Sequence, residues 1–186
     1  KNPEKSGVIL SATEGDANAM GKFVADAISI SSGWKACFPN LVPDIPRGWG
    51  AELGYFINNT DYSYNTWVDM QMTDHQRDPS FLSSSVMAGT VGKHPTLYLF
   101  ADDIHTGKNT ISPQEMKNTK ARFFSDAFPT LNNPKATPLF TSTYTPWDEE
   151  DTNAELKRSN VFRYSQTPIL KFDPDGNEEW EGEKCF

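Results

Sequence analysis

The chain has 186 residues and carries 25 acidic against 17 basic side chains, a formal net charge of −8. Hydrophobic residues make up 37% of the chain and aromatic residues 12%, which excludes an intrinsically disordered protein. The acidic balance and the lack of a lysine or arginine cluster exclude nucleic acid as a partner. No run of about 18 apolar residues occurs, so no transmembrane segment is predicted.

The N-terminal part predicts a strand followed by a helix. Residues 7–11 form a short apolar run that is typical of a strand, and residues 16–30 carry apolar side chains at every third or fourth position. Asp16 is the expected N-cap of this helix. One interpretation is a helix packed on a sheet, and the alternative is an amphipathic segment that leaves the protein body for a membrane interface.

Two stretches with alternating apolar and polar residues predict an antiparallel hairpin. Residues 51–57 form the first stretch and residues 66–72 the second, with a polar turn between them. In the second strand, Trp67, Asp69 and Gln71 should share the face that points away from the core. An indole beside a carboxylate and an amide can stack on a sugar ring and hydrogen-bond its hydroxyl groups, so this face is a candidate carbohydrate site.

Two further tryptophans extend this candidate site. Trp49 and Trp147 lie in proline-containing loops, where binding residues tend to gather. The competing interpretation is structural, because large aromatic side chains mostly pack inside proteins.

Paired carboxylates on the same hairpin suggest a hydrolase as a further alternative. Glu52 and Asp69 are expected on the same open face, and glycoside hydrolysis uses two carboxyl groups across the scissile bond. The sequence does not give the separation of these two groups. A binding module is therefore favoured over an enzyme.

The stretch from residue 96 to residue 127 predicts a central strand, a loop and a helix. Residues 96–101 are apolar on both faces, which is typical of a covered strand. The helix is expected over residues 113–127, with Ser112 as N-cap, Pro113 at the first helical position and Glu115 completing a capping box.

The loop in this stretch also has a metal-binding interpretation. The fourteen residues from Asp102 to Glu115 resemble the pseudo-EF loop of small dimeric calcium sensors, with an apolar residue four places before the final glutamate. That resemblance implies calcium and makes Asp102, Asp103 and Glu115 candidate ligands. Otherwise no cofactor is expected. Asp103 could also orient His105 as a general base, which makes His105 a candidate catalytic residue.

Three features favour a secreted or extracellular protein. Cys37 and Cys185 are the only cysteines and are expected to form a disulfide bond that closes most of the chain. Asn58 begins an Asn-Asn-Thr sequon and is a candidate glycosylation site. The chain starts without methionine or an apolar leader, as a trimmed product would.

Together these patterns predict a single, mainly β domain over residues 1–186. Further strands are expected near residues 139–145, 161–165 and 167–173. The expected fold is an antiparallel β-sandwich with two flanking helices, with α+β as the alternative. The favoured function is a secreted module that binds carbohydrate or another surface ligand. A membrane-active, toxin-like β protein and a glycoside hydrolase are the alternatives, and the oligomeric state is left open.

Overall fold

The computed structural model describes residues 3–75, 78–88, 90, 92–132, 136–163, 170–172 and 178–180. The chain divides into two compact units, Lys1–Ala154 and Glu155–Phe186. The first unit holds the main sheet and nearly all helices. The second holds a two-stranded antiparallel sheet of β9 (Leu170–Phe172) and β10 (Glu178–Trp180).

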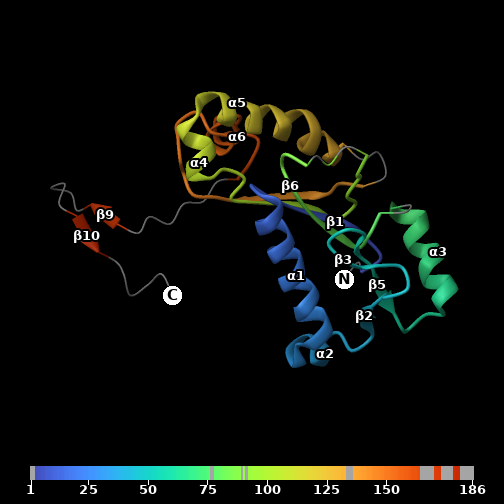
Figure 1. Ribbon diagram of the computed structural model, residues 1–186. Coiled ribbons are helices and arrows are strands. Elements are labelled where there is room, and N and C mark those ends of the chain that lie inside the picture. The colour runs from blue at the N-terminus through green and yellow to red at the C-terminus, as the bar shows by residue number, and fades with distance from the viewer. Residues whose placement is uncertain are drawn as a thin grey trace. The chain divides into compact units, whose positions relative to one another are not determined.

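The main sheet contradicts the predicted antiparallel sandwich. Six strands form one mixed sheet in the order β3-β4-β6-β1-β7-β8, and the four strands from β6 to β8 in this order are parallel. Helices lie on both faces of the sheet, so the fold is α/β (Figure 1). The sheet strands are β1 (Gly7–Ser11), β3 (Trp49–Gly50), β4 (Gly54–Tyr55), β6 (Phe81–Ser85), β7 (Tyr98–Asp102) and β8 (Leu139–Thr143).

The connections between these strands carry the helices and one small sheet. The helices are α1 (Glu14–Ile30), α2 (Ser32–Cys37), α3 (Tyr64–His75), α4 (Gly107–Ile111), α5 (Pro113–Arg122), η1 (Phe123–Ala127), η2 (Phe128–Leu131) and α6 (Thr152–Arg158). Strands β2 (Leu41–Pro43) and β5 (Ile57–Asn59) pair separately from the main sheet. The two predicted helices are confirmed, since α1 spans residues 14–30 and α5 continues through η1 to residue 127.

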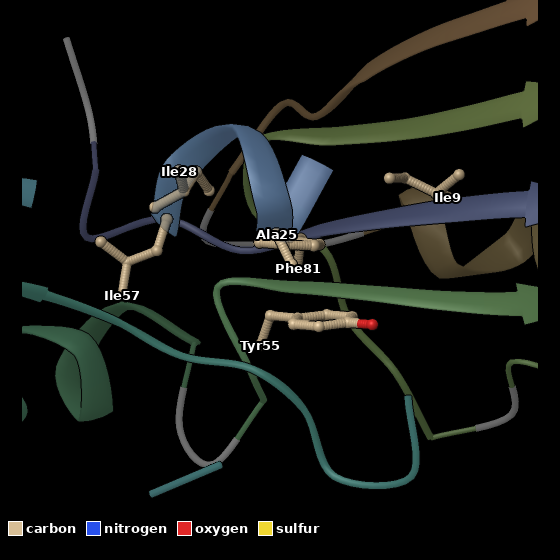
Figure 2. Packing of buried hydrophobic residues seen from close by; sticks show 6 residues of the cluster. All are labelled: Ile9, Ala25, Ile28, Tyr55, Ile57 and Phe81. Carbon is tan, nitrogen blue, oxygen red and sulfur yellow. The ribbon is translucent and has the colours of Figure 1, made fainter. Parts of the chain in front are cut away.

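Helix α1 covers one face of the sheet through close contact with small residues. Gly21 is buried, and a Cβ atom placed on it would lie 2.3 Å from Oγ of Ser83 on β6. A cluster of buried apolar side chains also packs between the helix and the strands (Figure 2). Its members are Ile9, Ala25, Ile28, Tyr55, Ile57 and Phe81.

Tyr98 closes the same face beside β1. A Cβ atom on Gly7, its partner in the parallel ladder, would lie 2.3 Å from two ring carbons of Tyr98, so only glycine leaves room for the ring. Burial raises the pKa of the Tyr98 hydroxyl to about 12, because the phenolate would lose its hydration. The α1 face is thus closely packed at Gly7 and Gly21.

The opposite face is covered by α5 and η1 through phenylalanine rings. Phe123 is fully buried, and its ring centroid lies 6.0 Å from that of Phe140 on β8. Phe124 and Phe128 complete a cluster of four rings with centroid separations of 5.2–6.0 Å. Aromatic contacts of this kind add to the stabilisation that area burial provides.

The predicted hairpin is wrong in both strands. Residues 51–53 of the first stretch form a turn, and the rest divides between β4 and β5, which belong to different sheets. The stretch around Trp67 forms helix α3, in which Trp67 and Gln71 are one turn apart and both buried, while Asp69 is exposed. Seven residues fit an alternating pattern and a helical one equally well when only a few are large and apolar. Tertiary contacts decide the choice, since the Trp67 and Gln71 side chains both donate to the carbonyl oxygen of Ile57.

Strand β6 was not predicted from the sequence. Its serine-rich sequence carries a weak strand signal, although four of its five residues are buried. The small side chain of Ser83 is required there because α1 approaches closely at Gly21. With β6 missing, the alternation of strands and helices was not apparent, and the parallel sheet was not predicted.

Candidate functional site

The carboxyl ends of the parallel strands gather polar residues at one edge of the sheet. In the ladders, Ser11 of β1 pairs with both Ser85 of β6 and Asp102 of β7, and Asp102 pairs with Thr143 of β8. The chain leaves β1 towards β6 and leaves β7 towards β8, so the strand order reverses between β1 and β7. Open α/β sheets bind ligands outside the carboxyl ends of their strands near such a switch point. This carboxyl edge is the candidate site.

The β1 end of the edge is closed by its own hydrogen bonds. Thr13 is the N-cap of α1, where its Oγ1 accepts from the backbone N–H of Asp16. The predicted cap, Asp16, lies one turn inside the helix and accepts a hydrogen bond from the Thr13 hydroxyl at 2.6 Å. The Glu14 carboxylate accepts from the backbone N–H of Ser85 at 3.3 Å. These polar groups mainly fix the start of α1.

The β7 end presents two carboxylates held by the loop after β8. The Thr143 hydroxyl donates to Asp102, and the backbone N–H of Thr145 donates to Oδ1 of Asp103 at 2.7 Å. Asp103 is exposed and has φ 40°, in the left-handed region that few residues other than glycine adopt. Hydrogen bonds from β8 and the segment after it therefore fix Asp102, at the end of β7, and Asp103, the next residue.

Trp147 lies on the second of these loops. Its side chain is 45% exposed, and a Cβ atom on Gly107 would lie 3.4 Å from its Cζ3, so the indole lies beside the first residue of α4. The backbone N–H of Trp147 donates to Asp151, which is buried and also accepts from the N–H of Ala154. The loop that carries the ring is thus anchored, and part of the ring faces solvent.

His105 has a structural position behind this edge. It is 2% exposed, and its Nε2 accepts a hydrogen bond from the backbone N–H of Thr152, with the Thr152 hydroxyl 2.8 Å away. Burial lowers the pKa of His105, and the Asp151 carboxylate opposes this effect. A neutral imidazole that accepts from the first N–H of α6 is part of the helix cap. The Asp103 carboxylate bonds to Thr145, so the hydrogen bonds of the described residues give no support to the predicted Asp103–His105 pair.

Trp67 and Gln71 lie in a buried network away from the carboxyl edge. Trp67 is 1% exposed and Gln71 is fully buried, and the Arg47 guanidinium donates to the Gln71 side chain. The same guanidinium lies 4.3 Å from the ring centroid of Phe56. Both predicted ligand-binding residues therefore lock α3 against the preceding loop, and neither presents a surface to a ligand.

The remaining hairpin candidates are separated. Trp49 packs edge-on against Tyr55 and Phe81, with ring centroids 5.5 and 6.1 Å apart. Glu52 is exposed in the turn between β3 and β4, and Asp69 is exposed on α3. The shared sheet face on which the paired-carboxylate hypothesis depended does not exist.

Of the predicted metal ligands, Glu115 has a role in the helix start. Its backbone N–H donates to the N-cap Ser112 at 3.3 Å, which is one half of the predicted capping box. The other half, a bond from the Glu115 side chain back to the Ser112 N–H, is not among the hydrogen bonds of the described residues. Within the described ranges, no group of three or more His, Cys, Asp or Glu side chains could hold a metal ion. The calcium loop thus finds no support in the arrangement of Asp102, Asp103 and Glu115.

Two covalent-modification predictions stay untested. Cys37 is an exposed, free cysteine at the end of α2, and its predicted partner Cys185 lies outside the described residues. Asn58 lies on β5 and pairs with Val42.

None of the described helices is long and apolar enough to span a bilayer.

Asp102 and Asp103 were predicted as metal ligands and Trp147 as a ligand-binding residue, each from a separate pattern. The fold brings all three to the carboxyl edge of the sheet. Their loops follow adjacent parallel strands, a relation that was hidden while β7 and β8 were assigned to a sandwich. Comparison with known proteins adds no further guide: no protein-family model matches the chain, and no curated protein matches it in sequence.

Proposed function

We propose that this chain is a binding module for a polyhydroxylated ligand, a carbohydrate, held at the carboxyl edge of β7 and β8. The observation that carries the proposal is the half-exposed indole of Trp147, anchored on the loop that also binds the Asp103 carboxylate. A sugar ring has an apolar C–H face that packs on an indole and hydroxyl groups that donate to carboxylates.

The rigidity of the loops supports this assignment. Trp147 and Asp103 are each tied to backbone or carboxylate groups of the neighbouring segment, so a ligand would meet a preformed surface. The edge offers mainly hydrogen-bond acceptors, namely the carboxylates and threonine hydroxyls. This inventory suits a neutral sugar and disfavours phosphorylated or sulfated ones, which the net charge of −8 would also repel.

Glycan-array binding of the full chain tests the proposal. Wild type is expected to bind a defined set of glycans. Trp147→Ala should weaken binding about tenfold, equivalent to about 1.4 kcal/mol, whereas Trp147→Phe should retain part of it. Phe23→Ala is the matched control, because Phe23 is an aromatic residue on α1 that is 73% exposed and remote from this edge in the sequence.

Asp103→Asn provides a second, independent arm. Asparagine tolerates the left-handed conformation and can still accept from Thr145, so the loop should keep its shape while the ligand loses a charged acceptor. Reduced binding with an unchanged melting temperature is expected. A wild-type blank across a broad array, or full binding by folded Trp147→Ala, would rule out the proposal.

A further inference from the structure

A hollow lies between the turn that follows β6 and the helical segment of α5 and η1. Its volume is about 400 Å³, and it is open to solvent, since all five of its lining residues are exposed. It is lined by Met87, Asn118, Ala121, Arg122 and Ser125. None of these residues takes part in the contacts of Trp147 or Asp103, so the hollow is independent of the proposed carbohydrate site.

The polar side of this hollow presents hydrogen-bond donors. Oδ1 of Asn118 accepts from Gln114 at 2.9 Å, which leaves the amide nitrogen of Asn118 as the donor end. Nη1 of Arg122 donates to Asp126 at 2.8 Å, and a guanidinium has four further N–H groups. The Ser125 hydroxyl donates its proton to Asp126 at 2.6 Å, so the donors left for a ligand are those of Asn118 and Arg122.

Asp126 fixes the cation and limits the charge that the hollow can accept. The pKa of Asp126 is lowered by the hydrogen bonds from Ser125 and Arg122, so its carboxylate is ionised at neutral pH. It therefore offsets part of the Arg122 charge. A dianion such as phosphate would meet this carboxylate, whereas a monoanion can use the remaining guanidinium donors.

The apolar side of the hollow is formed by Met87 and Ala121. Met87 is 49% exposed although it is large and apolar, and its thioether side chain adapts to ligands of different shape. A ligand that satisfies both sides has one anionic end and a short apolar body. From this geometry we infer that the hollow binds small amphiphilic monocarboxylates, with the carboxylate on Arg122 and Asn118 and the apolar body against Met87.

Chemical-shift titration of the isotope-labelled full chain tests this inference with hexanoate and phenylacetate as probes. Both are expected to shift the backbone signals of Met87, Ala121, Arg122 and Ser125, with a Kd of about 1 mM. Hexanol and 2-phenylethanol keep the apolar bodies without the charge. They should bind at least about tenfold more weakly, because they lack the charge-assisted bond to Arg122.

Matched variants separate the two sides of the site. Arg122→Gln should reduce hexanoate affinity about tenfold, to that of hexanol. Lys117→Gln removes a cation from the same helix outside the lining and should leave affinity unchanged. Ala121→Phe should fill the hollow and abolish binding of both probes while Arg122 stays in place. Melting temperatures identify any variant that is not folded.

Three results would overturn the inference. They are an absence of shifts at these positions up to about 10 mM probe, equal binding of hexanoate and hexanol, and tighter binding of inorganic phosphate than of hexanoate. Loss of carboxylate binding in Arg122→Gln together with intact glycan binding would show that the two sites act separately.

Discussion

The two faces of the main sheet are closed in different ways. On the α1 face, Gly21 brings the helix into contact with Ser83, and the ring of Tyr98 fills the space that Gly7 leaves open. On the α5 face, phenylalanine rings around Phe123 hold helix and sheet apart. Close contact between small residues leaves no room for a ligand between α1 and the sheet, whereas the exposed side of α5 and η1 lines a hollow together with Met87.

Removing the central ring of the α5 face is expected to have the largest effect. Phe123→Ala deletes a fully buried ring that contacts three other rings, so it should lower the free energy of unfolding by about 3–5 kcal/mol. Urea unfolding followed by tryptophan fluorescence measures the loss. A change below about 1 kcal/mol would show that the rings do not support this face.

The α1 face should be sensitive to the addition of one methyl group. Gly21→Ala places a Cβ atom 2.3 Å from Oγ and 2.9 Å from Cβ of Ser83, so overpacking should cost about 1–3 kcal/mol. The matched control is Gly15→Ala in the same helix, where the nearest atom is 3.8 Å away. That change should stabilise the protein by about 0.4–1 kcal/mol. Equal effects of both substitutions in urea unfolding would contradict the close-contact model.

The region behind the carboxyl edge differs from both faces because the stability that His105 contributes there depends on pH. The pKa of His105 is lowered in the folded protein, so protons bind more readily to the unfolded chain. Stability from this site is complete above about pH 6.5 and is lost as the pH falls towards the lower, folded-state pKa. The urea concentration at the unfolding midpoint of wild type should therefore decrease when the pH is lowered from 7.5 to 5.

His105→Gln isolates this effect. Glutamine can accept from the N–H of Thr152 without titrating, so the variant should lose part of the pH dependence between these two values. His94→Gln changes an exposed histidine and should keep the wild-type dependence. If the urea midpoints of wild type and His105→Gln changed identically with pH, protonation of His105 at the start of α6 would not explain the pH dependence.

The smallest effect is expected for the Ser83 hydroxyl. Its Oγ is buried and has no hydrogen-bond partner among the described residues. Ser83→Ala removes this polar group while keeping the Cβ atom, so stability should be unchanged or rise by up to about 1 kcal/mol. A loss of more than about 1 kcal/mol would mean that the hydroxyl makes an interaction that the close-contact model lacks.

Several local features could be predicted from the sequence because their causes are local. The period of α1, the Ser112-Pro113 start of α5 and the apolar run of β7 each depend on residues within a few positions. Asp103 was expected on a loop that leaves a central strand, and it lies there, whereas Asp102, expected on the same loop, is the last residue of β7. The N-cap of α1 was placed three residues too late, at Asp16 in place of Thr13.

The errors arose where distant residues decide the structure. Trp67 and Gln71 fit a strand by alternation, but their hydrogen bonds to the backbone of Ile57 select a helix. The strand β6 consists largely of serines, and it is buried because α1 packs against it. Neither fact can be read from a short window of sequence, because each depends on contacts made across the chain.

The sequence by itself therefore determined the acidic charge, the positions of α1 and α5 and of strands β1, β7 and β8, and the candidate residues Asp103 and Trp147. Only the tertiary structure decided that these strands run parallel, that Trp147 and Asp103 follow neighbouring strands, and that Arg122 lines a hollow with Met87. The physical reason is that helix periods and caps act over one or two turns. Strand order and the packing of the two faces depend on which distant segments exclude water from each other.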